Sequence, residues 1–375
     1  MKEKKKNIFE RVALSRLQKH EKSKNFEDQD LDDVELLTLK KVHRNTIVWA
    51  AIIGACGVLF YYVPVYFSDF IANDMVLKFS IFEKPISLAI PPLVLGFILM
   101  FIEIVSLFHL NIRAIEKMTV LTNFPNVVDP HYEVHMSALI SIGVEKPRKN
   151  EFLIGLNPYE GYSKVWIFSL FLFNKMKAAV SNMIFKQLIR KLLGRYAIRI
   201  LVDLAGMPIF AFWNAYASHK ILKQSKLRML APKIINYTTS VLKSKHSEKE
   251  EFKAILYDLL QYLAIKKRGY NENHYLLSLS LLSAFEIPTK TEHRLDPLFN
   301  DKFTSLDEEL RRDISKLLVV GMMLDGGVSK SEKIELIEMH EKGLIDVDIK
   351  TVKKMIKMFQ NGQGIQCIKT ELKLV

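Results

Sequence analysis

The sequence predicts a mainly all-α protein, in which a two-helix transmembrane hairpin is followed by cytosolic helical domains. Two observations lead to this fold class. Two long, uncharged apolar segments lie close together in the first third of the chain. In the last third, apolar residues recur at helical spacing next to helix-capping signals. With 49% apolar residues among 375, the chain can fill substantial cores and is not a disordered protein.

Four parts follow one another along the chain. Residues 1–45 are a charged cytosolic segment that does not fit a cleavable signal peptide, because the basic region of such a peptide is short. Residues 46–112 form the hairpin, residues 113–247 a basic domain apposed to the membrane, and residues 248–375 a C-terminal helical domain. The chain has only two cysteines, which excludes a disulfide-stapled secreted fold.

The hairpin consists of two predicted spans, at about 46–68 and 85–110. The first is free of charge and long enough to cross a hydrocarbon core of about 30 Å. The connection between the spans carries three acids and two lysines, whereas the outer flanks are basic. By the positive-inside rule, both termini then lie in the cytosol of a multi-pass protein of the bacterial inner membrane.

Glu103 is the one acid within the apolar length of the second span. One interpretation places it near the cytosolic end of the span, where it reaches water or pairs with Arg113. The other makes it part of an ion or proton pathway, since a charge inside a membrane is costly and is kept for a function.

The basic domain carries the whole charge excess of the protein. Residues 161–247 hold 15 lysines and arginines and a single acid, whereas the net charge of the full chain is +13. A predicted helix at 175–199 has an apolar stripe with basic shoulders, which is typical of a helix at an anionic membrane surface. The alternative is that the stripe packs on the domain's own core. The predicted contacts to anionic lipid headgroups are Lys186, Arg190, Lys191, Arg195 and Arg199.

The next segment, 200–218, is apolar and almost long enough to span, but it contains Asp203 and a Gly-Met-Pro interruption. Basic residues flank both of its ends, so a single crossing would export one of them. The expectation is therefore a membrane-dipping hairpin or a buried helix pair. Asp203 is expected to pair with Arg199, four residues earlier on a helix, and an ion-pathway role is the alternative.

The C-terminal domain shows helical patterns at about 249–267, 272–286, 305–325, 329–342 and 346–360. Its sharpest local motif is an Asp-Gly-Gly turn at 325–327 followed by Ser329 and Glu332. This S-x-x-E spacing predicts a capping box, in which each of the two residues bonds the backbone N–H of the other.

Two parts of the chain resemble known families. Gly206, Pro208, Asn214, Ser218 and Arg228, with the basic helix before them, are similar to the core of the EcsC family. This resemblance is confined to the middle of the chain. Members of that family are proposed to be membrane-associated or transport-associated accessory proteins. The resemblance thus implies a location more than a reaction.

The Asp-Gly turn and capping box are similar to the tellurite-resistance TerB-like domain, over roughly residues 250–362. That resemblance implies an all-α interaction module of two related halves, with divalent metal at Asp325 and Glu332. A trace of the first half lies earlier in the chain, where Lys267 stands in place of Asp325 and His274 in place of Glu332. The departure weakens a shared metal site, and the alternative role of the acids is capping and turn structure.

No nucleotide-binding, hydrolase, CxxC or HExxH motif occurs, so we expect no enzyme and no cofactor beyond that divalent cation. The leading prediction is a membrane scaffold or accessory protein, linked to membrane stress, whose cytosolic module recruits a protein partner. The alternative is a small channel or transporter subunit, in which oligomerised hairpins build a path near Glu103 and Asp203. Nucleic acid ranks third as a partner, since the basic domain has no recognisable binding motif.

Overall fold

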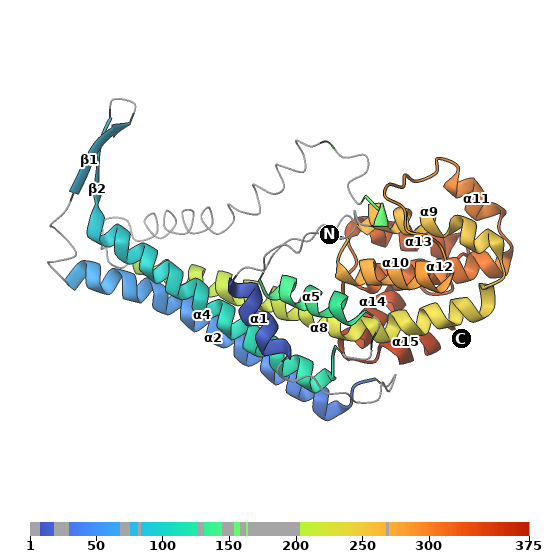
Figure 1. Ribbon diagram of the computed structural model, residues 1–375, viewed down its shortest axis with the longest axis horizontal. Coiled ribbons are helices and arrows are strands. Elements are labelled where there is room, and N and C mark those ends of the chain that lie inside the picture. Colours follow the sequence, from blue (N-terminus) through green and yellow to red (C-terminus); the bar gives the residue numbers. More distant parts are fainter. Residues whose placement is uncertain are drawn as a thin grey trace. The chain divides into compact units, whose positions relative to one another are not determined.

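The computed structural model describes residues 8–18, 30–67, 76–81, 84–125, 129, 131–144, 154–157, 163, 203–267 and 270–374. Helices supply nearly all of the regular structure in these residues, which confirms the predicted all-α class (Figure 1). The chain forms two compact units. We call them the apolar unit, within residues 40–117 and 163–222, and the bundle unit, within residues 1–39, 118–162 and 223–375.

The apolar unit is built on two long helices, α2 (Asp33–Phe67) and α4 (Ile90–Thr122). Both are long and apolar enough to cross a membrane, with mean hydropathies of 2.0 and 2.4 in their most apolar windows. They lie side by side in Figure 1, and a methyl group placed at Gly96 of α4 would lie 3.4 Å from the ring of Tyr61 on α2. The described part of the first predicted span, 46–67, lies within α2, which begins well before it.

The connection between these helices contains a β-hairpin that the sequence analysis missed. Strands β1 (Val76–Ile81) and β2 (Lys84–Ala89) pair antiparallel, with Val76 opposite Ala89 and Ile81 opposite Lys84. The predicted second span began at residue 85, and this start is wrong because 85–89 belong to β2. From Leu77 onward, apolar and polar residues alternate along β1, a period of two that favours a strand over a helix.

A third helix, α8 (Met207–His246), begins in the apolar unit. The described part of 200–218 breaks at the Gly-Met-Pro sequence, as predicted: Asp203 and Leu204 are helical, residues 205–206 form a turn, and residues 207–218 belong to one continuous helix. A membrane-dipping hairpin or a buried helix pair stays a prediction for this segment. The Gly-Met-Pro interruption coincides with the start of that helix. Gly206 lies in the turn before it, and Pro208 occupies its first turn, where a missing N–H costs no hydrogen bond.

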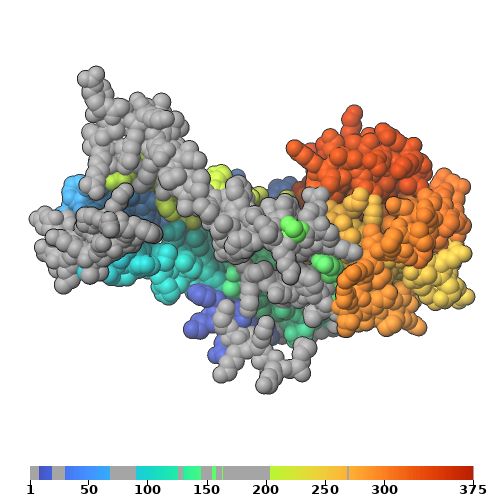
Figure 2. All heavy atoms as spheres, turned by 90° about the horizontal axis from the view of Figure 1, so that it is seen from above, coloured from blue at the N-terminus to red at the C-terminus, as the bar shows by residue number. Residues whose placement is uncertain are grey.

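The bundle unit packs shorter helices around one apolar core, and in Figure 2 its C-terminal helices form a closely packed body, coloured orange to red. The core is buried, with leucine, isoleucine, valine, methionine and phenylalanine drawn mainly from the helices between α8 and α15. The helices are α1 (Ile8–Gln18), α5 (Tyr132–Gly143), α9 (Glu250–Lys267), α10 (Glu272–Ala284), α11 (Phe299–Ser305), α12 (Glu308–Met323), α13 (Lys330–Glu341), α14 (Ile349–Gln360) and α15 (Gly364–Thr370).

Five of these helices, α9, α10, α12, α13 and α14, were predicted from apolar periodicity, and their ends differ from the prediction by only a few residues. Helices α1, α11 and α15 were missed. The last two are too short for a period of 3.6 to show. The predicted amphipathic helix at 175–199 lies outside the described residues.

Candidate functional site

Helices α10 and α13 begin in the same way. Ser329 and Glu332 form the predicted capping box at the start of α13, which confirms that prediction. Asn271 and His274 form a second capping box at the start of α10. In this second box the imidazole Nδ1 of His274 accepts a hydrogen bond from the backbone N–H of Asn271. In most capping boxes a glutamate or glutamine side-chain oxygen takes this role. The two stretches that align in the sequence therefore both begin a helix with a capping box.

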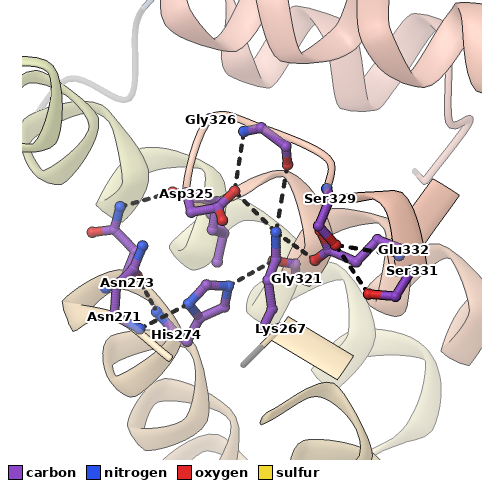
Figure 3. A network of polar contacts seen from close by, with 12 residues as sticks. Lys267, Asn271, Asn273, His274, Gly321, Asp325, Gly326, Ser329, Ser331 and Glu332 are labelled. Carbon is purple, nitrogen blue, oxygen red and sulfur yellow. Dashed lines mark hydrogen bonds and ion pairs between the residues drawn. The ribbon is translucent and has the colours of Figure 1, made fainter. Parts of the chain in front are cut away.

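Lys267, the last residue of α9, lies between these two helix starts (Figure 3). Its side chain is fully buried, and its Nζ lies 2.9 Å from Asp325 Oδ1 and 2.6 Å from Glu332 Oε1. Glu332 is itself buried, and its Oε2 accepts the backbone N–H of Ser329 at 2.7 Å. One ammonium therefore compensates two carboxylates, one of which also caps a helix.

The turn that carries Asp325 is fixed by Gly326, whose φ is +72°. Asp325 Oδ1 accepts the backbone N–H of Gly327 at 3.0 Å, which closes an Asx-type turn. Non-glycine residues avoid this left-handed region, and a Cβ at Gly326 would also lie 2.7 Å from Leu227 Cδ1.

We predict that Gly326→Ala lowers the free energy of unfolding by about 1–2 kcal/mol, since alanine is strained at this φ. Gly327→Ala is the matched control, because a Cβ at Gly327 meets nothing within 4 Å. Urea denaturation of both variants measures the difference. Equal losses in the two variants would show that the turn geometry does not matter.

Asp325 and Glu332 do not fit a divalent cation in this geometry. Hard cations such as Ca²⁺ take six to eight oxygen ligands. Here both carboxylates already face the ammonium of Lys267, which stands where such an ion would have to bind. In addition, the described residues contain no group of three or more His, Cys, Asp or Glu side chains that could hold a metal. The arrangement supports the alternative of capping and turn structure.

Two buried histidines of the bundle unit are held neutral. His274 Nδ1 accepts an N–H from Asn271 while its Nε2 donates to the carbonyl of Gly321 at 3.0 Å, which describes one neutral tautomer. Burial, reinforced by the charge of Lys267, lowers the pKa of His274 to about 4. The second histidine is His135, whose Nδ1 accepts a hydrogen bond from Arg228 and whose Nε2 bonds Asp129. Burial lowers the pKa of His135 to about 4, although the bond to Asp129 acts to raise it.

These pKa values predict a loss of stability in mild acid. The folded-state pKa of each histidine is near 4, below the ordinary value of 6.5. Below pH 6.5 the unfolded chain therefore takes up protons that the folded chain does not, so the contribution of each histidine to the free energy of unfolding is complete above pH 6.5 and is lost as the pH falls toward 4. Each histidine contributes roughly 3 kcal/mol over that window. Thermal denaturation between pH 7 and 4.5 measures the slope. His274→Gln keeps a capping side chain but does not titrate, so we expect a shallower slope; an unchanged slope would contradict this role.

Arg228 of α8 joins three segments of the bundle unit, and its buried side chain is only 1% exposed. Its guanidinium donates to His135 Nδ1 on α5 at 2.9 Å and to the Glu272 carbonyl on α10 at 2.7 Å. The same group donates to Asn273 Oδ1 at 3.3 Å. The sequence marked Arg228 only through the EcsC-like pattern, and its buried structural role was not foreseen.

The second polar site lies in the apolar unit, where the side-chain amide of Asn214 on α8 donates to Glu103 Oε1 on α4 at 2.5 Å. A methyl group placed at Gly57 of α2 would lie 3.4 Å from the other oxygen of Glu103. Three helices therefore meet at this carboxylate. The expected pairing with Arg113 is replaced by Asn214, and Glu103 lies between two uncharged stretches of α4, 90–102 and 104–112.

Asp203 accepts a hydrogen bond from the hydroxyl of Tyr66 at 2.5 Å, near the end of α2. The two candidate pathway residues are therefore held by different partners at different levels of the apolar unit. The partner expected for Asp203, Arg199, lies outside the described residues. The predicted lipid contacts lie there too, namely Lys186, Arg190, Lys191, Arg195 and Arg199.

No protein-family model matches this chain, and neither a curated protein nor a solved structure does.

Proposed function

We propose that this chain is an integral membrane scaffold or accessory protein. In this proposal, α2 and α4 anchor it in the bacterial inner membrane, and the bundle unit acts as a cytosolic module for a protein partner. The observation that carries the proposal is the outward exposure of apolar side chains on both anchoring helices. A core helix of a soluble protein is mostly buried, whereas only 22% of the apolar window of α2 and 6% of that of α4 are buried.

The exposed side chains are large, and they recur along the apolar length of both helices. They include a tryptophan near the start of the apolar part of α2, as expected for an interfacial anchor. Burial of apolar surface is worth roughly 25 cal/mol per Å², so a continuous surface of this kind in water is unfavourable and marks contact with lipid or protein. The residues are Val48, Trp49, Ile52, Phe60, Val63 and Phe67 on α2, and Leu93, Val94, Phe97, Ile98, Met100, Phe101, Ile102 and Ile104 on α4.

The bundle unit differs in kind from the anchor, which supports a separate role as an interaction module. Its core consists of buried apolar side chains, and the buried ammonium of Lys267 is paired with two carboxylates. The two matching capping boxes of α10 and α13 are consistent with the TerB-like resemblance, which implies recruitment of a cytosolic partner. Scaffolding in membrane stress remains part of the proposal.

Alkaline extraction of membranes tests the anchor. We expect the full-length chain to stay in the membrane pellet in sodium carbonate and to leave it only in detergent. Recovery in the carbonate supernatant would overturn the proposal.

A second candidate function, a small channel or transporter subunit, is favoured by one observation. Glu103 lies between two uncharged stretches of α4 and is held by Asn214, an arrangement that intramembrane carboxylates in proton and ion pathways share. Glu103→Gln in reconstituted liposomes separates the two functions. A channel loses its ion flux on this change, whereas a scaffold has no flux to lose and keeps its localisation.

A further inference from the structure

We infer that the beginning of α8, with the turn before it, from Asp203 to His219, is a third membrane-embedded segment that lies antiparallel to α2 and starts on the far side of the bilayer, the side of the β1–β2 connection. The inference rests on the proposed membrane anchor. It assigns a place to a segment whose sequence leaves open whether it enters the bilayer.

The contacts of the segment from Asp203 to His219 with α2 run in antiparallel order along the apolar part of α2. Asp203 meets Tyr66 at the far end of α2, through the 2.5 Å bond from the tyrosine hydroxyl. His219 meets His43, just before the apolar part of α2, where the two ring nitrogens lie 3.0 Å apart. At 1.5 Å per residue, α2 rises roughly 35 Å between these contacts, and the segment from Asp203 to His219 would rise roughly 24 Å as a helix, against a hydrocarbon core of about 30 Å. The segment therefore crosses most of the core, and the side chains at its ends reach the two ends of the apolar part of α2.

Between these ends the two helices approach closely at Gly54. A Cβ at this position would lie 2.6 Å from the carbonyl oxygen of Phe210 and 2.7 Å from Asn214 Nδ2. Small residues at the contact are what allow the backbones of membrane helices to pack together, and amide side chains commonly link such helices by hydrogen bonds. Asn214 supplies such a link to Glu103 at the same level.

The other face of this segment carries exposed apolar side chains, as α2 and α4 do. Phe212 and Tyr216 are at least 50% exposed, whereas the first lysine of α8 is Lys220, directly after the contact of His219 with His43. The change from apolar to basic residues along α8 thus coincides with the near end of the apolar part of α2. Lipid acyl chains are the occupant that fits this face, because it continues the exposed apolar surface of the anchor.

The positive-inside rule alone would keep both ends of the segment on the cytosolic side, because basic residues flank both of them. The contacts with Tyr66 and His43 outweigh this preference, because a segment kept on one side of the bilayer cannot touch both of these residues. Since α4 returns the chain to the near side, the placement requires the chain to reach the far side again before residue 203.

Single-cysteine labelling of the full-length protein tests the inference. In a parent in which Cys56 and Cys367 are replaced by alanine, cysteine is placed at Ala72, Ala205, Lys220 or Ser247 and probed with a membrane-impermeant maleimide. Sealed vesicles of both orientations are used, with detergent-opened vesicles as the control for reactivity. We expect Ala205→Cys to react on the same side as Ala72→Cys, and Lys220→Cys on the same side as Ser247→Cys.

The outcomes separate this inference from the proposed anchor. If Ala72→Cys and Ser247→Cys react on opposite sides but Ala205→Cys reacts with Ser247→Cys, the anchor stands and the placement of α8 is wrong. Reaction of Ala205→Cys only after detergent also overturns its far-side position. If all four positions react alike in both orientations, the anchor itself fails. Adding Gly54→Val, which clashes with the Phe210 backbone, should remove the far-side labelling at Ala205, whereas Gly57→Ala should preserve it.

Discussion

Replacing Lys267 by methionine is expected to lower the free energy of unfolding of the bundle unit by about 3–5 kcal/mol, the usual cost of removing one partner of a buried ion pair. Methionine keeps the length and apolar stem of the side chain, so loss of packing is small. What is lost is the ammonium between Asp325 and Glu332, at 2.9 and 2.6 Å. Two carboxylates then face each other, and one of them cannot move without opening a capping box. Urea denaturation followed by circular dichroism measures the change.

Lys266 provides the matched control one residue earlier on the same helix. It also forms an ion pair, with Glu335 at 2.5 Å, but its side chain is 33% exposed whereas that of Lys267 is fully buried. Pairs that water screens are worth about 0–1 kcal/mol. Lys266→Met should therefore cost far less than Lys267→Met, and similar costs for the two variants would show that burial does not set the value of the Lys267 network.

A double substitution separates charge from shape at this site. Lys267→Met combined with Glu332→Gln removes one of the two uncompensated charges while the glutamine still serves the capping box. We expect it to recover part of the stability lost in Lys267→Met. A double variant that is less stable than the single one would indicate that Glu332 does not depend on Lys267.

Local signals in the sequence were sufficient where neighbours along the chain determine the structure. Ser329 and Glu332 belong to one helix start, so their capping box follows from spacing alone, and five helices of the bundle unit follow from apolar periodicity. The position of Lys267 between Asp325 and Glu332 depends instead on packing between helices that are far apart in the chain. The repeat alignment brought these residues into correspondence, but it could not show that they touch.

The same limit applies in the apolar unit. One interpretation gave Glu103 water or Arg113 of its own helix as a partner, whereas Asn214 approaches from a distant part of the chain. The Gly-Met-Pro sequence was interpreted as an interruption because proline and glycine break helices, and a turn at 205–206 does separate the helical residues 203–204 from α8. Breaker residues were sufficient to place this boundary, because it is set by local backbone preferences.

The strongest test of the anchor uses the exposed phenylalanines of α4. We expect that Phe97→Asp combined with Phe101→Asp prevents insertion of α4 and lowers the fraction of the protein retained in the membrane. An aspartate at the centre of a membrane helix costs about 2.5–3.5 kcal/mol, and the loss of each phenylalanine adds a few tenths. Both side chains are at least 60% exposed, so in a soluble protein the same changes would stay within about 0.5 kcal/mol. Carbonate extraction of the double variant gives the retained fraction directly.

Ile334 on α13 supplies the control for this experiment, because it is an equally exposed apolar residue (59%) in the bundle unit. Ile334→Asp should leave both membrane retention and the urea midpoint unchanged. If the α4 double variant behaved in the same way, the exposed face of α4 would not contact lipid, and it would have to be covered by protein or left in water. Loss of retention on α4 alone instead ties the exposed apolar surface to the bilayer. The outward direction of these side chains is then the physical reason that α4 cannot be the core helix of a soluble protein.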